Sequence, residues 1–128
     1  MLQRHVYAPI NCDVAQEMYV RRDPAVLAGV VADPAVWRSW WPDLQLEPTR
    51  DRGVEGRYWT VSGPVSGEME IWLEPGAAGT LVHWFVRAQA APGCGPRAAR
   101  RWQRRAVRVW RAQLFAVKDR LEAVKSSP

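Results

Sequence analysis

The segment from Arg97 to Lys125 constrains the fold more than any other part of the chain. It contains no glycine or proline, and its apolar residues recur at steps of three and four, the spacing of one face of an α-helix. These residues are Trp102, Ala106, Val109, Trp110, Leu114, Val117, Leu121 and Val124. The segment predicts one amphipathic helix of about 28 residues, about 42 Å long at 1.5 Å per residue. Such a helix needs a second layer of structure to cover its apolar face.

Two short helices are expected nearer the N-terminus. Residues 14–22 have a period of two through Met18 and Val20, which predicts a strand. The dipeptide Asp-Pro follows at 23–24 and again at 33–34. Aspartate can cap a helix, and proline suits the first turn. The two expected helices therefore span residues 24–32 and 34–41, and Pro42 stops the second.

Between Pro42 and Arg97 the sequence changes to short strands separated by turn residues. Each segment is rich in β-branched and aromatic residues or alternates apolar and polar side chains. The four expected strands are residues 44–50, 56–62, 69–74 and 80–87. Short connections between them predict an antiparallel meander. Together with the strand at 14–22, they predict an α+β domain whose curved sheet of about five strands wraps the C-terminal helix.

The length of 128 residues suits a single domain. We expect that domain to span residues 14–125, with an irregular leader over 1–13. No apolar run approaches the roughly 20 residues of a membrane helix, and the N-terminus lacks the apolar core of a secretory signal. A cytoplasmic protein is therefore expected. Cys12 and Cys94 stand far apart, and we expect both to be reduced thiols without a disulfide or zinc.

Four stretches of the sequence resemble the START-like, or helix-grip, superfamily (SRPBCC). They are DPAVLAGVVADPAVWRSWWPDL at 23–44, DRGVEGRYWTVSG at 51–63, GEMEIWLEP at 67–75 and GTLVHWFVRA at 79–88. In particular, the chain is similar to short actinobacterial-type members, of unassigned function, of the polyketide cyclase/dehydrase and lipid transport branch. The two-helix block matches the pattern of that branch at Pro24, Val26, Val31, Asp33, Pro34, Trp37, Trp40 and Pro42. It departs from the pattern at Leu27, where the family usually has Trp.

The resemblance implies a container for small molecules between the sheet and the C-terminal helix. Members of ordinary size have six strands after the two helices, whereas four are expected here. The shorter sheet implies either a shallower pocket or an open edge, and an open edge favours pairing with a second copy of the chain. The expected partners are a hydrophobic small molecule and, through the open edge, a homodimer. No cofactor is expected.

A pocket of this kind would bind a lipid- or polyketide-like ligand by burying apolar surface. Alternation along the strand at 69–74 places Met69, Ile71 and Leu73 inside and Trp72 outside. The residues expected to line the pocket are Trp41, Trp59, Met69, Ile71, His83, Phe85, Trp102, Trp110 and Leu114. His83 or Tyr58 would supply an orienting polar contact.

The aromatic cluster of Trp37, Trp40 and Trp41 admits two interpretations. The three positions share one face of the second short helix. Their rings would then wedge the helix pair onto the sheet, a purely structural role. Alternatively, Trp41 lines the mouth of the cavity and stacks on a planar ligand.

The sequence contains few residues that indicate catalysis. His83 is a weak candidate for acid–base chemistry, but no Ser, Cys or carboxylate stands at a spacing that would orient it, which favours a structural histidine. Glu68, Glu70 and Glu74 share a strand face that is more typical of solvated surface than of a hydrolase pair. Metal-ligand clusters, phosphate-binding glycine loops and nucleophile motifs are absent from the sequence. An aromatase/cyclase-like enzyme, implied by the resemblance, is the alternative function.

The formal net charge of +5 is unevenly distributed. Residues 1–96 carry eight Arg against eleven Asp and Glu, a net −3, whereas residues 97–128 carry ten Arg and Lys against two acidic residues, a net +8. On the C-terminal helix, a stripe is expected opposite the apolar face, formed by Arg100, Arg104, Arg108 and Arg111. It is either a solvated surface or a contact for an anionic partner, such as RNA, the ribosome or a membrane surface.

Overall fold

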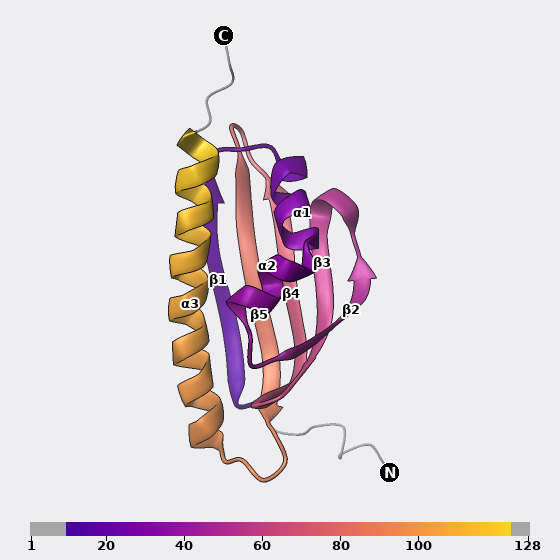
Figure 1. Ribbon diagram of the computed structural model, residues 1–128, viewed down its shortest axis with the longest axis vertical. Coiled ribbons are helices and arrows are strands. Elements are labelled where there is room, and N and C mark those ends of the chain that lie inside the picture. Colours follow the sequence, from indigo (N-terminus) through magenta and orange to yellow (C-terminus); the bar gives the residue numbers. More distant parts are fainter. Residues whose placement is uncertain (1–9, 124–128) are drawn as a thin grey trace.

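The computed structural model describes residues 10–123 and shows a five-stranded antiparallel sheet with three α-helices on one face (Figure 1). In chain order the elements are β1 (Cys12–Val20), α1 (Pro24–Ala32), α2 (Pro34–Trp40), β2 (Gln45–Asp51), the 3₁₀ turn η2 (Gly53–Glu55), β3 (Gly56–Ser62), β4 (Val65–Pro75), β5 (Thr80–Ala90) and α3 (Pro96–Ala123). None of the helices in the described residues combines the length and apolar character that crossing a membrane requires.

The strand order is β1-β5-β4-β3-β2, and all neighbouring pairs are antiparallel. Strands β2 to β5 form the meander predicted from their short connections, and β1 adds to the side of β5. We call the face of the sheet that packs on the helices the inner face. Helix α3 covers this face at β1 and β5, while α1 covers it at β3 and β4. The α+β architecture expected from the sequence, with about five strands and a long C-terminal helix, is confirmed.

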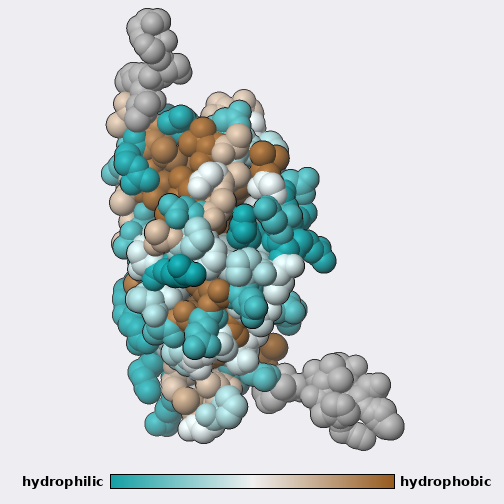
Figure 2. All heavy atoms as spheres, turned by 45° about the vertical axis from the view of Figure 1, so that its right-hand side comes forward, coloured by the Kyte–Doolittle hydropathy of each residue, from teal (hydrophilic) through white to brown (hydrophobic). Residues whose placement is uncertain are grey.

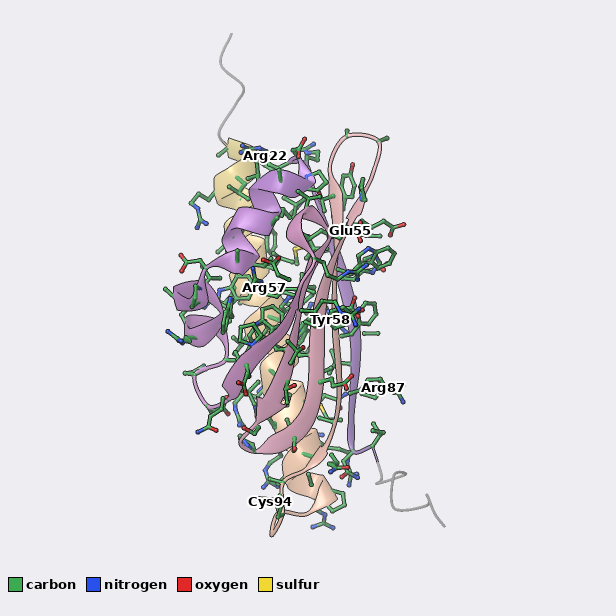
Figure 3. The ribbon with its side chains drawn as sticks, turned by 90° about the vertical axis from the view of Figure 1, so that its right-hand side faces the viewer. Arg22, Glu55, Arg57, Tyr58, Arg87 and Cys94 are labelled. Atoms are coloured by element: carbon green, nitrogen blue, oxygen red, sulfur yellow. The ribbon has the colours of Figure 1, made fainter. Side chains whose placement is uncertain are left out.

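The pairing of β4 with β5 determines which side chains face the helices. Met69, Ile71 and Leu73 are buried on the inner face, as their alternation predicts. Their partners on β5 are Val86, Trp84 and Val82, which are also buried. The intervening β5 residues 81, 83, 85 and 87 therefore point to the outer face, away from the helices. Figure 3 shows Tyr58 and Arg87 on that outer side of the sheet.

Strands β4 and β5 are longer than expected from sequence alone, β1 lies two residues earlier, and β3 has its expected bounds. Strand β1 starts at Cys12, inside the expected leader, and β4 starts at Val65, four residues before its alternating segment. The β4–β5 ladder continues through Gly67, where an added Cβ would lie 2.2 Å from the backbone oxygen of Arg87. Glycine at this point allows the two strands to approach closely. Residues 1–9 of the expected leader, and the expected helix beyond Ala123, lie outside the described residues.

Both Asp-Pro signals cap a helix as predicted. The Asp23 carboxylate accepts a hydrogen bond from the backbone N–H of Ala25 at 2.8 Å, and Asp33 accepts one from Ala35 at 3.0 Å. Helix α1 is apolar on all sides: it buries Leu27 and Val31 and leaves further valine and alanine side chains half-buried or exposed. Figure 2 shows this apolar surface as the upper brown area. The α1 helix is thus only partly covered by the rest of the domain.

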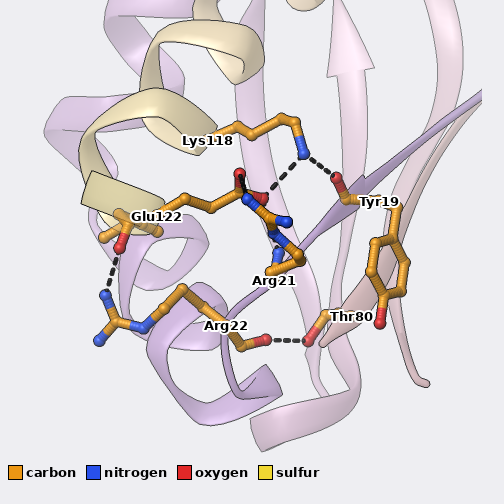
Figure 4. Close-up of polar contacts among 7 residues, drawn as sticks. Tyr19, Arg21, Arg22, Thr80, Lys118 and Glu122 are labelled. Atoms are coloured by element: carbon orange, nitrogen blue, oxygen red, sulfur yellow. Dashed lines mark hydrogen bonds and ion pairs between the residues drawn. The ribbon is translucent and has the colours of Figure 1, made fainter. Parts of the chain in front are cut away.

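Side chains of α3 bond the backbone of the edge strand β1 near both of its ends. Near the end of β1, Lys118 Nζ donates to the backbone oxygen of Tyr19, and Glu122 accepts bonds from Lys118 Nζ and the backbone N–H of Arg21, each at 2.8 Å (Figure 4). We call Arg21, Lys118 and Glu122 the clasp. At the other end, Gln103 Oε1 accepts from the backbone N–H of Asp13 at 3.2 Å.

The opposite edge strand, β2, is also poorly suited to pairing. Pro48 has no backbone N–H to donate, and the β2–β3 register is irregular between Pro48 and Arg50. The open edge expected from the short sheet stays a prediction. Side chains of α3 bond the backbone of β1 near its two ends, and β2 is exposed but interrupted by a proline and a register shift.

Candidate functional site

The structure separates the nine residues predicted to line a pocket onto two faces of the sheet. Seven of them are buried on the inner side: Trp41, Trp59, Met69, Ile71, Trp102, Trp110 and Leu114. His83 and Phe85 instead lie on the outer face, as does Tyr58. The expectation that these three would share a cavity with the inner residues is wrong, because the register of β5 turns Trp84 inward and its neighbours outward.

Trp84 stands at the centre of the inner aromatic residues, although the predicted set omitted it. Its ring stacks on Trp41, at the end of α2, with centroids 5.5 Å apart and planes 18° apart. It also stacks on Trp110 of α3, at 5.3 Å and 19°. The polar residues His83 and Arg87 at alternating positions of β5 were the sequence signal for an outward odd-numbered face, and hence for an inward Trp84.

The sequence left two interpretations open for the aromatic cluster at the second short helix, and the structure supports the structural one. Trp37, Trp40 and Trp41 are all buried. Trp37 packs edge to face on Trp59 of β3, with ring centroids 5.4 Å apart. The ring centroids of Trp41 and Trp59 are 6.4 Å apart. These contacts fasten the short helix to the sheet. They also make Trp41 the link between α2 and Trp84.

Five indole N–H groups on the inner side have no hydrogen-bond acceptor among the described residues. They belong to Trp37, Trp41, Trp59, Trp84 and Trp110, which we call the tryptophan layer. Leaving one buried donor unpaired costs about 1–3 kcal/mol. Phenylalanine and leucine would avoid that cost but are smaller than tryptophan, so the layer combines large aromatic rings with five N–H donors.

On the outer face, His83 lies between two carboxylates and two aromatic rings. Its Nε2 is 2.8 Å from Glu74 Oε1, and its Nδ1 is 3.5 Å from Glu17 Oε1. The imidazole stacks on Trp72 at 4.4 Å and on Phe85 at 5.8 Å. The expectation that no carboxylate would orient His83 is wrong, because Glu17 and Glu74 come from the neighbouring strands β1 and β4. These contacts agree with the structural histidine that the sequence favoured.

Two shallow pockets open on the outer face on either side of Tyr58. The first, of about 260 Å³, is lined by Asp13, Val14, Ala15, Tyr58, Glu68, Met69, Glu70, Phe85 and Arg87. The second, of about 340 Å³, is lined by Thr49, Arg50, Tyr58, Trp59, Thr60 and Glu68. The guanidinium groups of Arg50 and Arg52 lie 5.2 and 5.5 Å from the Tyr58 ring. The Tyr58 side chain is therefore held between arginines on the side of the sheet away from the tryptophan layer.

The described residues contain no group of three or more His, Cys, Asp or Glu side chains that could hold a metal ion. Cys12 is buried at the start of β1, and Cys94 is exposed in the loop before α3. Burial and the nearby Asp13 carboxylate raise the pKa of Cys12 to about 11. Its thiol is thus a weak nucleophile near neutral pH.

The predicted stripe of Arg100, Arg104, Arg108 and Arg111 is exposed on α3, together with Arg97 and Arg101. Of the α3 arginines, Arg105 is the one that pairs with a carboxylate within the described residues, at 3.7 Å from Asp43. The acidic body of the domain therefore neutralises little of this helix through direct contact.

No family model matches the sequence, and no curated protein gives a significant match. Solved structures do match the fold. Protein DR_A0006 from Deinococcus radiodurans aligns with a TM-score of 0.62 at 14% identity, over 88% of this chain and 98% of that one. The Aha1 dimer from Colwellia psychrerythraea gives 0.61 at 15% identity, over 89% and 98%. TTHA0849 from Thermus thermophilus gives 0.55 at 14% identity, over 89% and 99%.

At such low identity, these likenesses establish the fold and nothing finer. The alignments cover 88% or 89% of this chain and 98% or 99% of each neighbour. The chain has a helix-grip fold. Because this fold carries many different functions, function must be argued from the site itself.

Proposed function

We propose that the protein binds a flat, largely apolar small molecule with oxygen acceptors against the tryptophan layer. The five buried indole N–H groups without an acceptor carry this proposal. Carbonyl, ether or phenolic oxygens of a ligand would accept from these donors and remove their cost. The indole rings would bury the apolar body of the same ligand.

The stacking geometry supports an aromatic ligand over a plain alkyl chain. Trp84 already stacks nearly parallel to two other rings, and a planar ligand would use the same contact. A flat molecule with ring oxygens is polyketide-like in chemistry. Such a ligand agrees with the polyketide cyclase/dehydrase and lipid transport branch that the sequence resembles. Membership of that branch is part of the proposal.

Ligand entry in this proposal requires α2 to move. The helix has seven residues, begins at Pro34 and ends two residues before Pro42. Trp37 and the following Trp41 attach it to the sheet. Trp41 directly follows α2 and covers Trp84. A ligand ring that replaces Trp41 on Trp84 would move α2 outward, next to the incompletely covered apolar surface of α1 (Figure 2).

The geometry opposes the cyclase-like alternative in the form that the sequence suggested. That alternative needed His83 as acid or base beside the ligand, yet His83 lies on the other face of the sheet, bound to Glu74 and Glu17. A ligand on Trp84 is separated from the imidazole by the sheet itself. Binding without catalysis by His83 is therefore the proposed activity.

Indole resonances in a proton–nitrogen NMR spectrum test the site directly. The probe is a hydroxylated anthraquinone, which is flat, aromatic and rich in oxygen acceptors. Binding to the tryptophan layer should move the Nε1–H signals of Trp41, Trp84 and Trp110 downfield as they gain acceptors. The Trp72 signal should stay in place, since that ring lies outside. Movement of Trp72 alone, or of no indole signal, would contradict the proposal.

A matched pair of variants gives an independent test. Trp84→Leu removes the inner ring, and Trp72→Leu removes a tryptophan from the outer face of the sheet. We expect Trp84→Leu to weaken probe binding at least tenfold and Trp72→Leu to leave it unchanged, as measured by fluorescence titration. If Trp84→Leu does not fold, Trp41→Phe replaces it as the test variant, because it keeps an aromatic ring on Trp84. Equal weakening by both leucine variants would place the ligand elsewhere.

Association of two copies remains a separate proposal. The neighbour from Colwellia is described as a dimer, and a homodimer was expected here from the sequence. Because α3 bonds β1 near both ends and Pro48 interrupts β2, we propose a dimer formed through side-chain surfaces. Sedimentation velocity at micromolar to millimolar concentration should show a mass twice that of the chain, and a monomer throughout would refute it.

A further inference from the structure

Every exposed residue from position 97 to position 111 of α3 is an arginine. These residues are Arg97, Arg100, Arg101, Arg104, Arg105, Arg108 and Arg111. At 100° per residue, positions 97, 101, 104, 108 and 111 follow one line along the helix, opposite the buried Ala106 and Trp110. The line is about 21 Å long at 1.5 Å per residue. Excluding Arg105, which pairs with Asp43, we call the set the arginine face.

This charge pattern is unfavourable for the isolated helix. Within residues 10–123, no ion pair joins the arginine face to a carboxylate. The first turn of α3 contains no acidic residue. Positive charge near a helix N-terminus opposes the helix dipole, and arginines three or four positions apart repel one another. An anionic partner would relieve both effects, which is why the pattern indicates binding.

We propose that the arginine face binds the phosphate backbone of nucleic acid. A duplex carries one negative charge per about 1.7 Å of its axis, so a 21 Å row of arginines meets several phosphates at once. Residues 1–96 carry a net charge of −3. A polyanion is therefore attracted to α3 and repelled by the rest of the domain. This site lies outside the tryptophan layer and does not depend on the proposed ligand.

The composition of the face favours nucleic acid over a membrane surface. A helix that lies in a bilayer interface inserts an apolar side, but the apolar side of α3 packs on the sheet through Trp102, Ala106 and Trp110. Over 97–111 the helix exposes no apolar side chain. The one large apolar side chain exposed on the described part of α3 is Phe115, 54% exposed, which lies on the same line one turn beyond Arg111. A single ring offers little base stacking. Recognition is thus of phosphates, without preference for base sequence.

Salt dependence of binding tests the proposal. The probe is a fluorescein-labelled 20-base-pair duplex of random sequence, followed by anisotropy from 50 to 200 mM KCl. If four or five arginines contact phosphates, the logarithm of affinity should fall with the logarithm of salt with a slope of about −4. That slope corresponds to a loss of roughly 250-fold over this range. A second duplex of unrelated sequence should bind equally well.

A double variant on the face and a control of equal charge locate the contact. Arg104→Gln with Arg108→Gln should reduce the steepness of the slope by about 2, and glutamine keeps a similar helix propensity. The control, Arg87→Gln with Arg120→Gln, changes two exposed arginines elsewhere and should retain the full slope. Circular dichroism and thermal melting confirm that both variants fold.

Three results would overturn the proposal. The first is no duplex binding at 50 mM KCl, and the second is an equal effect of both double variants, which would indicate general charge attraction. The third is binding to vesicles of phosphatidylcholine and phosphatidylserine without binding to the duplex, which would assign the face to a membrane. The Trp84→Leu variant should leave duplex binding unchanged, so failure here and failure of the ligand proposal are distinguishable.

Discussion

His83 and Trp84 are adjacent in the chain and have opposite surroundings. Trp84 packs between helices and sheet, whereas His83 meets two carboxylates on the outer face. Successive side chains of a strand point to opposite faces, so one pairing register determines both environments. Residue chemistry alone did not separate them, because histidine and tryptophan are both common at partly buried positions.

The two thiols should differ sharply in reactivity. Burial, with a smaller effect from Asp13, raises the pKa of Cys12 to about 11, while Cys94 is exposed. At pH 8 Cys12 is almost entirely the unreactive thiol. A disulfide exchange reagent with a coloured product should modify one thiol rapidly in the native protein and the second only in denaturant. Cys94→Ser should abolish the rapid phase, and two rapid thiols in the native protein would contradict the assignment.

Gly56 and Gly29 form a matched pair for a backbone prediction. Gly56 has φ of +121°, and a Cβ there would lie 2.0 Å from the backbone oxygen of Ile71. Gly56→Ala should therefore destabilise the protein by about 2–4 kcal/mol. Gly29 lies within α1 with open space around it, so Gly29→Ala should stabilise by about 0.5–1 kcal/mol. Urea unfolding measures both, and effects of the same sign would contradict this account.

At the scale of the elements, Asp33 is the junction between α1 and α2. Its backbone N–H donates to Val30 at the end of α1, and its carboxylate accepts from Ala35 in the first turn of α2. One residue thus ends one helix and starts the next. The abrupt bend between the helices directs the α2 tryptophans toward the sheet.

Replacing the Asp33 cap should weaken α2 selectively. Asp33→Ala removes the acceptor for Ala35 and should cost about 1 kcal/mol, whereas Asp33→Ser keeps an oxygen at the cap and should cost less. Urea unfolding monitored by tryptophan fluorescence gives both values, since α2 contains Trp37 and Trp40 and is directly followed by Trp41. Identical stability of the alanine variant and the original protein would show that the cap contributes nothing.

The ends of the helices could be predicted from local sequence better than the ends of the strands. The Asp-Pro caps and the three- and four-residue spacing of α3 are local signals, and the structure follows them within one or two residues over its described part. The ends of β4 and β5 are not local, because each extra pair requires the partner strand to continue opposite it. A strand end is determined by its neighbour as much as by its own residues.

At the scale of the whole molecule, the clasp joins the end of β1 to the last turns of α3. Residues about 100 positions apart meet there through Arg21, Lys118 and Glu122 (Figure 4). A bond from Lys118 and one from the backbone N–H of Arg21 lower the pKa of Glu122 below its ordinary value. The clasp also occupies the backbone oxygen of Tyr19 at the end of β1, which hinders edge-to-edge association at that end.

The clasp predicts a specific acid dependence of stability. Because the pKa of Glu122 is lower in the folded than in the unfolded chain, its ionised form stabilises the fold at neutral pH. This contribution is lost as pH falls from about 4.5 through the lowered pKa. Urea midpoints of Glu122→Gln should therefore change less between pH 6 and pH 3 than those of the original protein.

The matched control for this prediction is Glu68→Gln on the exposed outer face. It should retain the original pH dependence, since the structure shows no ion pair for Glu68 within residues 10–123. An acid dependence of Glu122→Gln as steep as that of the original protein would show that the clasp does not contribute.

Local sequence patterns were enough to predict the long amphipathic helix, both capped short helices, the inner face of β4 and the arginine stripe. Each depends on spacing within a few residues of one element, which the geometry of helix and strand translates directly into a face. The stacking of Trp84 between Trp41 and Trp110, the carboxylates around His83 and the bonds between α3 and β1 came only from tertiary contacts. The run from Thr80 to Arg87 has apolar residues on both faces, and His83 and Arg87 were its only local signal, so its orientation was established by pairing with β4 and β1. Such pairing depends on contacts distant in sequence, which no local pattern contains.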